Sequence, residues 1–208
     1  MLISCIMPTR GRPEFAADAV RQFQRQTWPE KELIILDDPD APSFTTPPAD
    51  PQIEYNRCAR RWTVGEKRNI AVARSLGGII AHWDDDDWYS QDRLEDQVQR
   101  LLSSNSMLTA YCPVPFTDGV RWWDYCNPRP DYGVGASFMY RREFWRANPF
   151  AGRMVAEDDQ FLDAARGRVA IAPGRGLMIA RIHPGNTSPR DPQGNPKQWV
   201  ASEAPACV

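Results

Sequence analysis

The chain of 208 residues lacks long apolar runs, paired cysteines and a large excess of charge of one sign. No apolar run approaches the roughly 20 residues that a membrane-spanning helix needs, so no membrane span is expected. The stretch from Met1 to Met7 has neither a basic segment nor a cleavage site. It is therefore expected to form a strand and not a signal peptide.

The five cysteines are odd in number and show no C-x-x-C spacing; they are Cys5, Cys58, Cys112, Cys126 and Cys207. This pattern argues against a zinc site and against a disulfide framework. Free thiols fit a reducing compartment, so a cytoplasmic location is expected.

The overall composition is that of an ordinary globular protein, with 42% hydrophobic and 25% charged residues. The length favours one compact domain. A formal net charge of −2 gives no general nucleic-acid-binding signature.

Four consecutive aspartates, Asp84 to Asp87, form the most informative stretch of the sequence. An apolar strand is predicted just before them at residues 77–83, and Ser90 is a candidate N-cap for a helix just after them. In open α/β sheets, ligands bind beyond the carboxyl ends of the strands. Carboxylates there suit Mg²⁺ or Mn²⁺, which in turn bind phosphates. The alternative is a solvated acidic turn, but the flanking Trp83 and Trp88 favour a binding site.

Apolar runs and helical spacing divide most of the chain into alternating elements. Strands are predicted at residues 2–7, 33–36, 53–55, 77–83, 107–112, 134–140, 169–171 and 177–182, and helices at residues 14–26, 65–75, 93–102, 142–147 and 157–166. The first strand–helix–strand unit has the length of a right-handed crossover, so an α/β fold with parallel strands is expected. Residues 113–132 show no clear periodicity. Residues 189–208 are expected to form a loosely ordered polar tail.

Three acidic groups follow predicted strands or precede a predicted helix: Asp37–Asp38, Asp84–Asp87 and Glu157–Asp159. So many carboxylates around one crevice require cations nearby. The candidates are Arg10, Arg12, Lys67, Arg68 and Arg181, although each could equally be a surface charge. A lone histidine is more often structural than a ligand, but His183 lies between a strand and a turn, where ligation is credible.

Seven segments, read in order, carry a family resemblance. They are residues 7–12 (MPTRGR), 33–38 (LIILDD), 65–69 (GEKRN), 83–88 (WDDDDW), 135–142 (GASFMYRR), 157–161 (EDDQF) and 181–188 (RIHPGNTS). Together they resemble a family 2 glycosyltransferase with the GT-A fold, a Rossmann-like α/β fold whose central mixed sheet is flanked by helices. The resemblance implies a single domain over residues 1–188, with a nucleotide-binding half of about 1–105 and an acceptor half of about 106–188.

The resemblance implies inverting transfer from an activated sugar, usually a UDP-sugar, with Mn²⁺ or Mg²⁺ as cofactor. By this resemblance the nucleotide sugar contacts Thr9, Arg10, Asp38, Arg68, Asp84 and Asp85. The metal is expected on Asp86 and His183, and the register within the four aspartates is ambiguous by one residue.

The resemblance also places Asp158 as the general base that takes the acceptor's proton, since its acidic neighbours can raise its pKa. Acceptor contacts are expected from Glu157, Trp122 and Trp123, and the acceptor itself is unidentified. Residues 157–159 could also be acidic simply because a helix begins there; both readings can hold at once.

Two other functions are open. A sugar nucleotidyltransferase would be expected to carry a glycine-rich phosphate loop after the first strand, whereas residues 8–13 hold only Gly11. A non-catalytic nucleotide- or Ca²⁺-binding module would use the aspartates only to hold a ligand.

Overall fold

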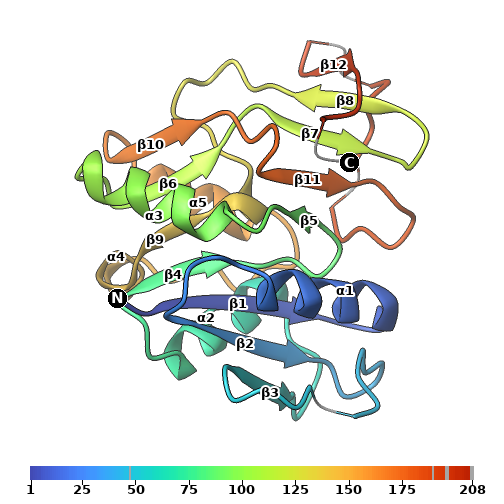
Figure 1. The fold of residues 1–208 in the computed structure, drawn as a ribbon, viewed down its shortest axis with the longest axis vertical. Helices are drawn as coiled ribbons and strands as arrows, with labels where there is room; N and C mark the ends of the chain where they lie inside the picture. Colours follow the sequence, from blue (N-terminus) through green and yellow to red (C-terminus); the bar gives the residue numbers. More distant parts are fainter. Residues whose placement is uncertain (47, 189, 195–196, 207–208) are drawn as a thin grey trace.

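The computed structural model describes residues 1–46, 48–188, 190–194 and 197–206. Its larger sheet has seven strands (Figure 1), in the spatial order β10 (Val169–Ala172), β6 (Leu108–Tyr111), β9 (Met139–Arg141), β4 (Ile79–His82), β1 (Ile3–Thr9), β2 (Lys31–Asp37) and β3 (Ile53–Arg57). Neighbouring strands are parallel except at β9, which is antiparallel to both β4 and β6. The predicted mixed α/β sheet is confirmed.

Helices cover both faces of this sheet because its strands are apolar on both sides. On one face lie α1 (Pro13–Gln24) and α3 (Arg93–Ser103), and on the other lie α2 (Val64–Arg74), α4 (Arg142–Ala147) and α5 (Glu157–Ala164). Along β1 the side chains alternate between the two cores: Cys5 and Met7 belong to the α1–α3 core, and Ile6 belongs to the other.

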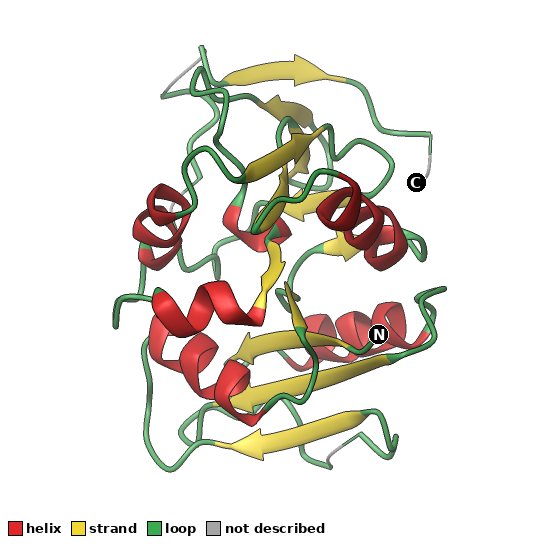
Figure 2. Cartoon of the chain, turned by 90° about the vertical axis from the view of Figure 1, so that its left-hand side faces the viewer, coloured by secondary structure: helices red, strands yellow, loops and turns green. Residues whose placement is uncertain are grey.

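A smaller sheet lies at the end of the molecule opposite β3 (Figure 2). Its five strands run in the order β12 (Trp199–Ser202), β8 (Trp122–Tyr125), β7 (Val114–Thr117), β11 (Met178–Arg181) and β5 (Trp88–Tyr89). Strands β7 and β8 lie in the stretch where the sequence showed no periodicity. All four β8 residues are half-buried, so no alternation of buried and exposed side chains marks the strand.

The C-terminal segment contributes to this sheet, which corrects the expectation of a loosely ordered tail. Strand β12 pairs antiparallel with β8, and the buried Trp199 packs edge-on against Phe116 and Tyr125. Four residues of the predicted tail, Trp199–Ser202, therefore form an ordered strand. Residues 189, 195–196 and 207–208 of that tail lie outside the described residues.

Two local predictions are wrong. The predicted strand at residues 134–140 divides into a 3₁₀ turn, η1 (Gly135–Ser137), and the short strand β9. The Ser137 hydroxyl closes that turn by donating to the Val134 carbonyl and accepting from the Tyr111 N–H. Ser90 does not cap α3, which begins at Arg93 after Asp92; its hydroxyl instead accepts from the Asp92 N–H.

The described part of the chain contains no helix that combines the length and the apolar character needed to cross a membrane. The four described cysteines are free thiols, and Cys207 lies outside the described residues.

The role of β12 can be tested with two adjacent substitutions. Trp199→Ala should lower the free energy of unfolding by roughly 3–5 kcal/mol, because it empties a buried aromatic site. Val200 is 51% exposed, so Val200→Ala should change it by less than about 0.5 kcal/mol. Chemical denaturation measures both values. Similar small effects at the two positions would show that the segment does not belong to the folded core.

Candidate active site

A cavity of about 790 Å³ opens beyond the carboxyl ends of β1, β2 and β4. Its wall includes the loop after β1, the turn after β4, the first residues of α5, and residues 185–188 and 190. Pockets for small molecules typically measure about 300–1,000 Å³, so this one is large enough for a nucleotide sugar. The acidic groups that the sequence singled out around Asp38, Asp84–Asp87 and Glu157–Asp159 all contribute to it.

The four-aspartate turn is fixed by buried aromatic residues. Trp83 is fully buried, lies edge-on to Phe23 and donates its indole N–H to the Ala19 carbonyl at 3.0 Å. The Tyr89 ring contacts Trp83 with a centroid separation of 4.3 Å, and the Tyr89 hydroxyl accepts from the Asp84 N–H at 2.9 Å. The turn is thus anchored at both ends before any ligand arrives.

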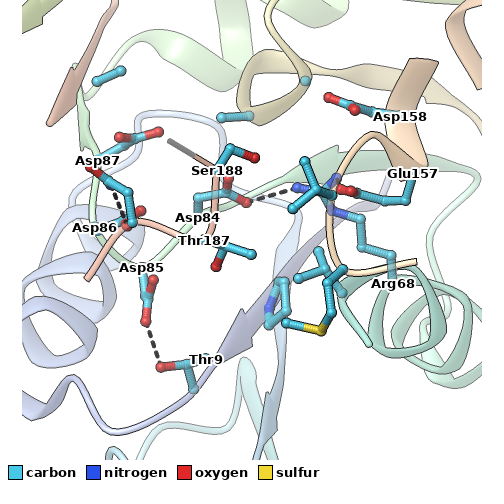
Figure 3. Close-up of a pocket in the computed structure, with 18 of the residues that line it drawn as sticks. Thr9, Arg68, Asp84, Asp85, Asp86, Asp87, Glu157, Asp158, Thr187 and Ser188 are labelled. Atoms are coloured by element: carbon cyan, nitrogen blue, oxygen red, sulfur yellow. Dashed lines mark hydrogen bonds and ion pairs between the residues drawn. The ribbon is translucent and has the colours of Figure 1, made fainter. Parts of the chain in front are cut away.

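Asp85 is buried between a hydroxyl and a cation. Thr9 Oγ1 donates to its Oδ2 at 2.6 Å (Figure 3). Arg12 Nη2 lies 3.0 Å from its Oδ1. Burial and the neighbouring Asp86 carboxylate nevertheless raise the pKa of Asp85 to about 7, even though Arg12 and Thr9 favour the charged form. A further cation near these carboxylates would therefore be stabilised.

Asp86 collects three donors on one oxygen. Its Oδ2 contacts Arg12 Nη1, lies 3.1 Å from His183 Nε2 and accepts from Asn186 Nδ2 at 3.3 Å. Burial alone would raise the pKa of Asp86, but the His183 hydrogen bond and Arg12 outweigh it and hold that pKa below its usual value. The Gly185 N–H donates to His183 Nδ1, so a neutral His183 ring carries its proton on Nε2 and donates it to Asp86.

Arg68 connects the four-aspartate turn to the acidic start of α5. Its buried guanidinium contacts Glu157 Oε1 through Nη1 and lies 3.1 Å from Asp84 Oδ1 through Nη2 (Figure 3). Burial raises the pKa of Glu157 despite this pairing. The predicted contact between Arg68 and the nucleotide stays a prediction, because its observed polar partners are carboxylates of the protein.

The neighbouring Lys67 contacts Asp38. Lys67 Nζ lies 2.9 Å from Asp38 Oδ2 and donates to the Thr9 carbonyl at 2.8 Å. The other Asp38 oxygen, Oδ1, is buried and has no hydrogen-bond partner among the described residues. Arg10 is more peripheral: its Nε lies 3.7 Å from Asp38, and its Nη2 lies 2.9 Å from Asp40.

Asp158 lies at the other end of the cavity, on the first turn of α5 (Figure 3). None of the described residues forms a hydrogen bond or ion pair with its carboxylate. The carboxylate lies directly over Gly135, where an added Cβ would come within 1.6 Å of Asp158 Oδ2. His82 holds this glycine in place, since its Nδ1 lies 2.7 Å from the Gly135 carbonyl. Burial lowers the pKa of His82 well below its usual value, so the ring is neutral and Nδ1 is the donor.

The predicted acceptor residues divide into two groups. Glu157 lines the cavity, whereas Trp122 and Trp123 lie on β8 outside its lining, and Trp123 is covered by the Arg121 guanidinium. The acceptor role of both tryptophans stays a prediction. Tyr125 and Tyr132 do line the cavity.

Sequence reasoning did not assign site roles to His82 or Gly135. His82 reads as one residue of an apolar strand, and Gly135 as one residue of a predicted strand. Only the folded contacts reveal that one holds the other against Asp158.

Asp86 and His183 are two neighbouring side chains whose chemistry suits a divalent ion. No group of three or more His, Cys, Asp or Glu side chains in the described ranges is arranged to hold an ion unaided. Asp86 Oδ2 and His183 Nε2 lie 3.1 Å apart, close to the separation of about 3 Å expected for adjacent ligands around an octahedral ion. Mg²⁺ commonly takes one or two protein ligands and completes its shell with phosphate and water oxygens.

Solved structures share this architecture. Residues of S. aureus TarS (1–349, in complex with UDP-GlcNAc) superpose with a TM-score of 0.72 at 17% identity, over 93% of this chain and 63% of that one. The mannosyltransferase PcManGT from Pyrobaculum calidifontis, in complex with GDP-Man and Mn²⁺, gives a TM-score of 0.63 at 15% identity, over 86% of this chain and 56% of that one. The fold is therefore the GT-A glycosyltransferase fold.

The sequence itself gives the family. The model of glycosyl transferase family 2 matches residues 4–160, and the chain belongs to that family. A putative colanic acid biosynthesis glycosyl transferase, WcaA of Escherichia coli (strain K12), is 33% identical over 98 residues, which are 45% of this chain and 35% of that protein. The chain spans less than half the length of the curated relatives that it matches.

Two arginines on α2 test whether the Arg68 bridge holds the site together. Arg68→Ala should lower the free energy of unfolding by roughly 3–5 kcal/mol, because it leaves Glu157 and Asp84 without their cation. Arg74 pairs with Glu54 at 2.6 Å but is 49% exposed, so Arg74→Ala should cost less than about 1 kcal/mol. Denaturant titration compares them. Equal costs would contradict a buried bridge.

Proposed function

We propose that this chain transfers a sugar from a nucleotide-sugar donor, expected to be a UDP-sugar, to an acceptor hydroxyl with inversion at the sugar carbon. The observation that carries the proposal is the arrangement of one cavity. Carboxylates already paired with cations line one end, and Asp158, with no hydrogen-bond or ion-pair partner among the described residues, lies at the other. Residues 1–105 would bind the donor and residues 106–188 the acceptor.

The nucleoside is expected near Asp38. A buried carboxylate oxygen without a partner is costly unless a ligand donates to it, and the imide N–H of uracil is such a donor. Thr9 and Lys67 lie beside Asp38 and Asp85 and fix their positions. The complexes of TarS with UDP-GlcNAc and of PcManGT with GDP-Man support a nucleotide-sugar donor as the ligand class.

The diphosphate is expected at the four-aspartate turn, the D-x-D-type motif of this chain. Asp86 and His183 would hold Mn²⁺ or Mg²⁺ together with the phosphate oxygens. The ion would supply charge neutralisation for the leaving diphosphate. Ligation at His183 Nε2 requires its proton to leave that nitrogen.

The proposed reaction is a single displacement. The acceptor oxygen forms a bond to the anomeric carbon while the bond from that carbon to the diphosphate oxygen breaks, and the electron pair leaves with the diphosphate. The acceptor's proton passes to a carboxylate oxygen of Asp158. Attack from the side opposite the leaving group inverts the anomeric carbon, and a base at the far end of the cavity fits that direction.

The acceptor is expected against the aromatic part of the wall. Phe116, Tyr125 and Tyr132 line the cavity, and aromatic faces with polar hydroxyls suit packing and hydrogen bonding to a sugar ring. We therefore infer that Tyr125 and Tyr132 contact the acceptor alongside Glu157.

Calorimetric titration with UDP tests the donor end. UDP should bind the parent more tightly with Mn²⁺ than with a chelator, and Asp86→Ala should remove most of that difference. Asp159→Ala should leave it in place, because Asp159 is exposed and outside the metal site. Equal UDP affinity with and without Mn²⁺ would contradict the metal's role.

Asp158→Asn tests the base. The substitution preserves shape but removes the basic carboxylate, so sugar transfer should fall by roughly a hundredfold to ten-thousandfold. UDP affinity should be nearly unchanged, since Asp158 lies away from the nucleotide end. Chromatography of the UDP released from a UDP-sugar, with water in place of the unidentified acceptor, measures the rate.

Asp159→Asn is the matched control. Asp159 is the next residue on the same helix turn and is exposed, so its loss should change transfer far less. If Asp159→Asn abolishes transfer and Asp158→Asn leaves the rate normal, the assignment of the base to Asp158 is wrong.

A further inference from the structure

Arg12 occupies the position where the metal is expected to bind, next to Asp86. It precedes α1 directly and follows Gly11, whose positive φ of +63° lets the loop turn back toward the four aspartates. Its side chain is only 19% exposed, and it lines the cavity. The guanidinium bridges two carboxylates, with Nη2 at Asp85 Oδ1 and Nη1 at Asp86 Oδ2.

The Asp86 oxygen that Arg12 contacts is also the one that lies beside His183, the other expected metal ligand. Asp86 Oδ2 has donors from Arg12, His183 and Asn186, while a carboxylate oxygen offers about two lone-pair sites. A divalent ion can bind there only after a donor withdraws. Arg12 is the donor with a permanent positive charge, so the ion repels it most strongly.

A displaced Arg12 has a chemically matched partner within the same cavity. The metal and the donor diphosphate would arrive at the same carboxylates, and a guanidinium binds phosphate oxygens through two parallel hydrogen bonds. The arginine lies in the loop just before α1 and lines the cavity, so its guanidinium and the diphosphate would share the same space.

We propose that Arg12 is a diphosphate-binding residue that exchanges partners: it occupies Asp86 in the free enzyme and moves onto the donor diphosphate when the metal binds. The inference rests on the proposed function, since it assumes a nucleotide diphosphate donor. It couples the two ligands, because metal binding frees the guanidinium that the diphosphate uses, and the diphosphate draws away the cation that blocks the metal.

The exchange predicts opposite changes in one variant. In Arg12→Gln, Mn²⁺ alone should bind roughly tenfold more tightly than to the parent, because the competing cation is gone. UDP at saturating Mn²⁺ should bind roughly tenfold to a hundredfold more weakly, the size of a lost charged hydrogen bond. Uridine affinity should be unchanged. Electron paramagnetic resonance of free Mn²⁺ gives the first value, and calorimetry gives the others.

Arg25→Gln is the control for net charge, because Arg25 is an exposed residue at the end of α1. It should change none of the three affinities. Arg12→Lys keeps the positive charge and serves if the glutamine variant fails to fold. Its single ammonium group should still oppose Mn²⁺ binding but should hold UDP less tightly than the parent.

Each alternative outcome has a distinct meaning. Unchanged or weaker Mn²⁺ binding in Arg12→Gln would overturn the claim that Arg12 blocks the metal. Equal losses of UDP and uridine affinity, or no loss, would overturn the diphosphate contact, leaving Arg12 as a fixed counter-ion. A parent that binds no UDP under any condition would instead refute the proposed function, and this inference with it.

Discussion

Four adjacent carboxylates at the end of one strand are the constraint on which this site depends. Burial raises the pKa of Asp85 to about 7 and raises the pKa of Asp87 well above its usual value. The pKa of Asp86 stays below its usual value only because His183 and Arg12 stabilise its charged form. The stabilising groups come from separate parts of the chain: the end of β1, the loop after it, and the segment after β11. Holding the aspartates together therefore also assembles the cavity.

Helix α2 joins the two ends of that cavity. Its consecutive residues Lys67 and Arg68 contact different partners, Lys67 pairing with Asp38 and Arg68 with Glu157 beside the proposed base. The helix is fixed at its start by a reciprocal capping box between Thr63 and Glu66. Gly65 lets α2 approach the loop before α5, because a Cβ there would lie 1.8 Å from a backbone oxygen of that loop. The two ends of the cavity, which we propose bind donor and acceptor, are thus connected by one helix.

The sequence was most informative where local patterns coincide with tertiary structure. The strand before Asp84, the helix containing Arg68 and the first turn at Asp158 could all be predicted, because each contains apolar residues at a recognisable spacing. Family resemblance then brought those distant segments to one site.

What could not be predicted depends on contacts between distant residues. Strand β12 has only four residues, Trp199–Ser202, and it is stabilised by pairing with β8 more than 70 positions earlier. The ion pair of Arg68 with Asp84 could not be predicted either. In the sequence either Lys67 or Arg68 could face Asp38, and only the orientation of the helix shows that Lys67 does. Likewise, no pattern in the sequence pairs His82 with Gly135.

The central claim is that donor and base lie on opposite sides of one sugar carbon. The most direct test is proton NMR of the first sugar released when the protein, with Mn²⁺, hydrolyses α-linked UDP-sugars in the absence of acceptor. Water then takes the acceptor's place, and the account predicts that the β-anomer is formed first and only later equilibrates with the α-anomer. Initial release of the α-anomer would contradict the account.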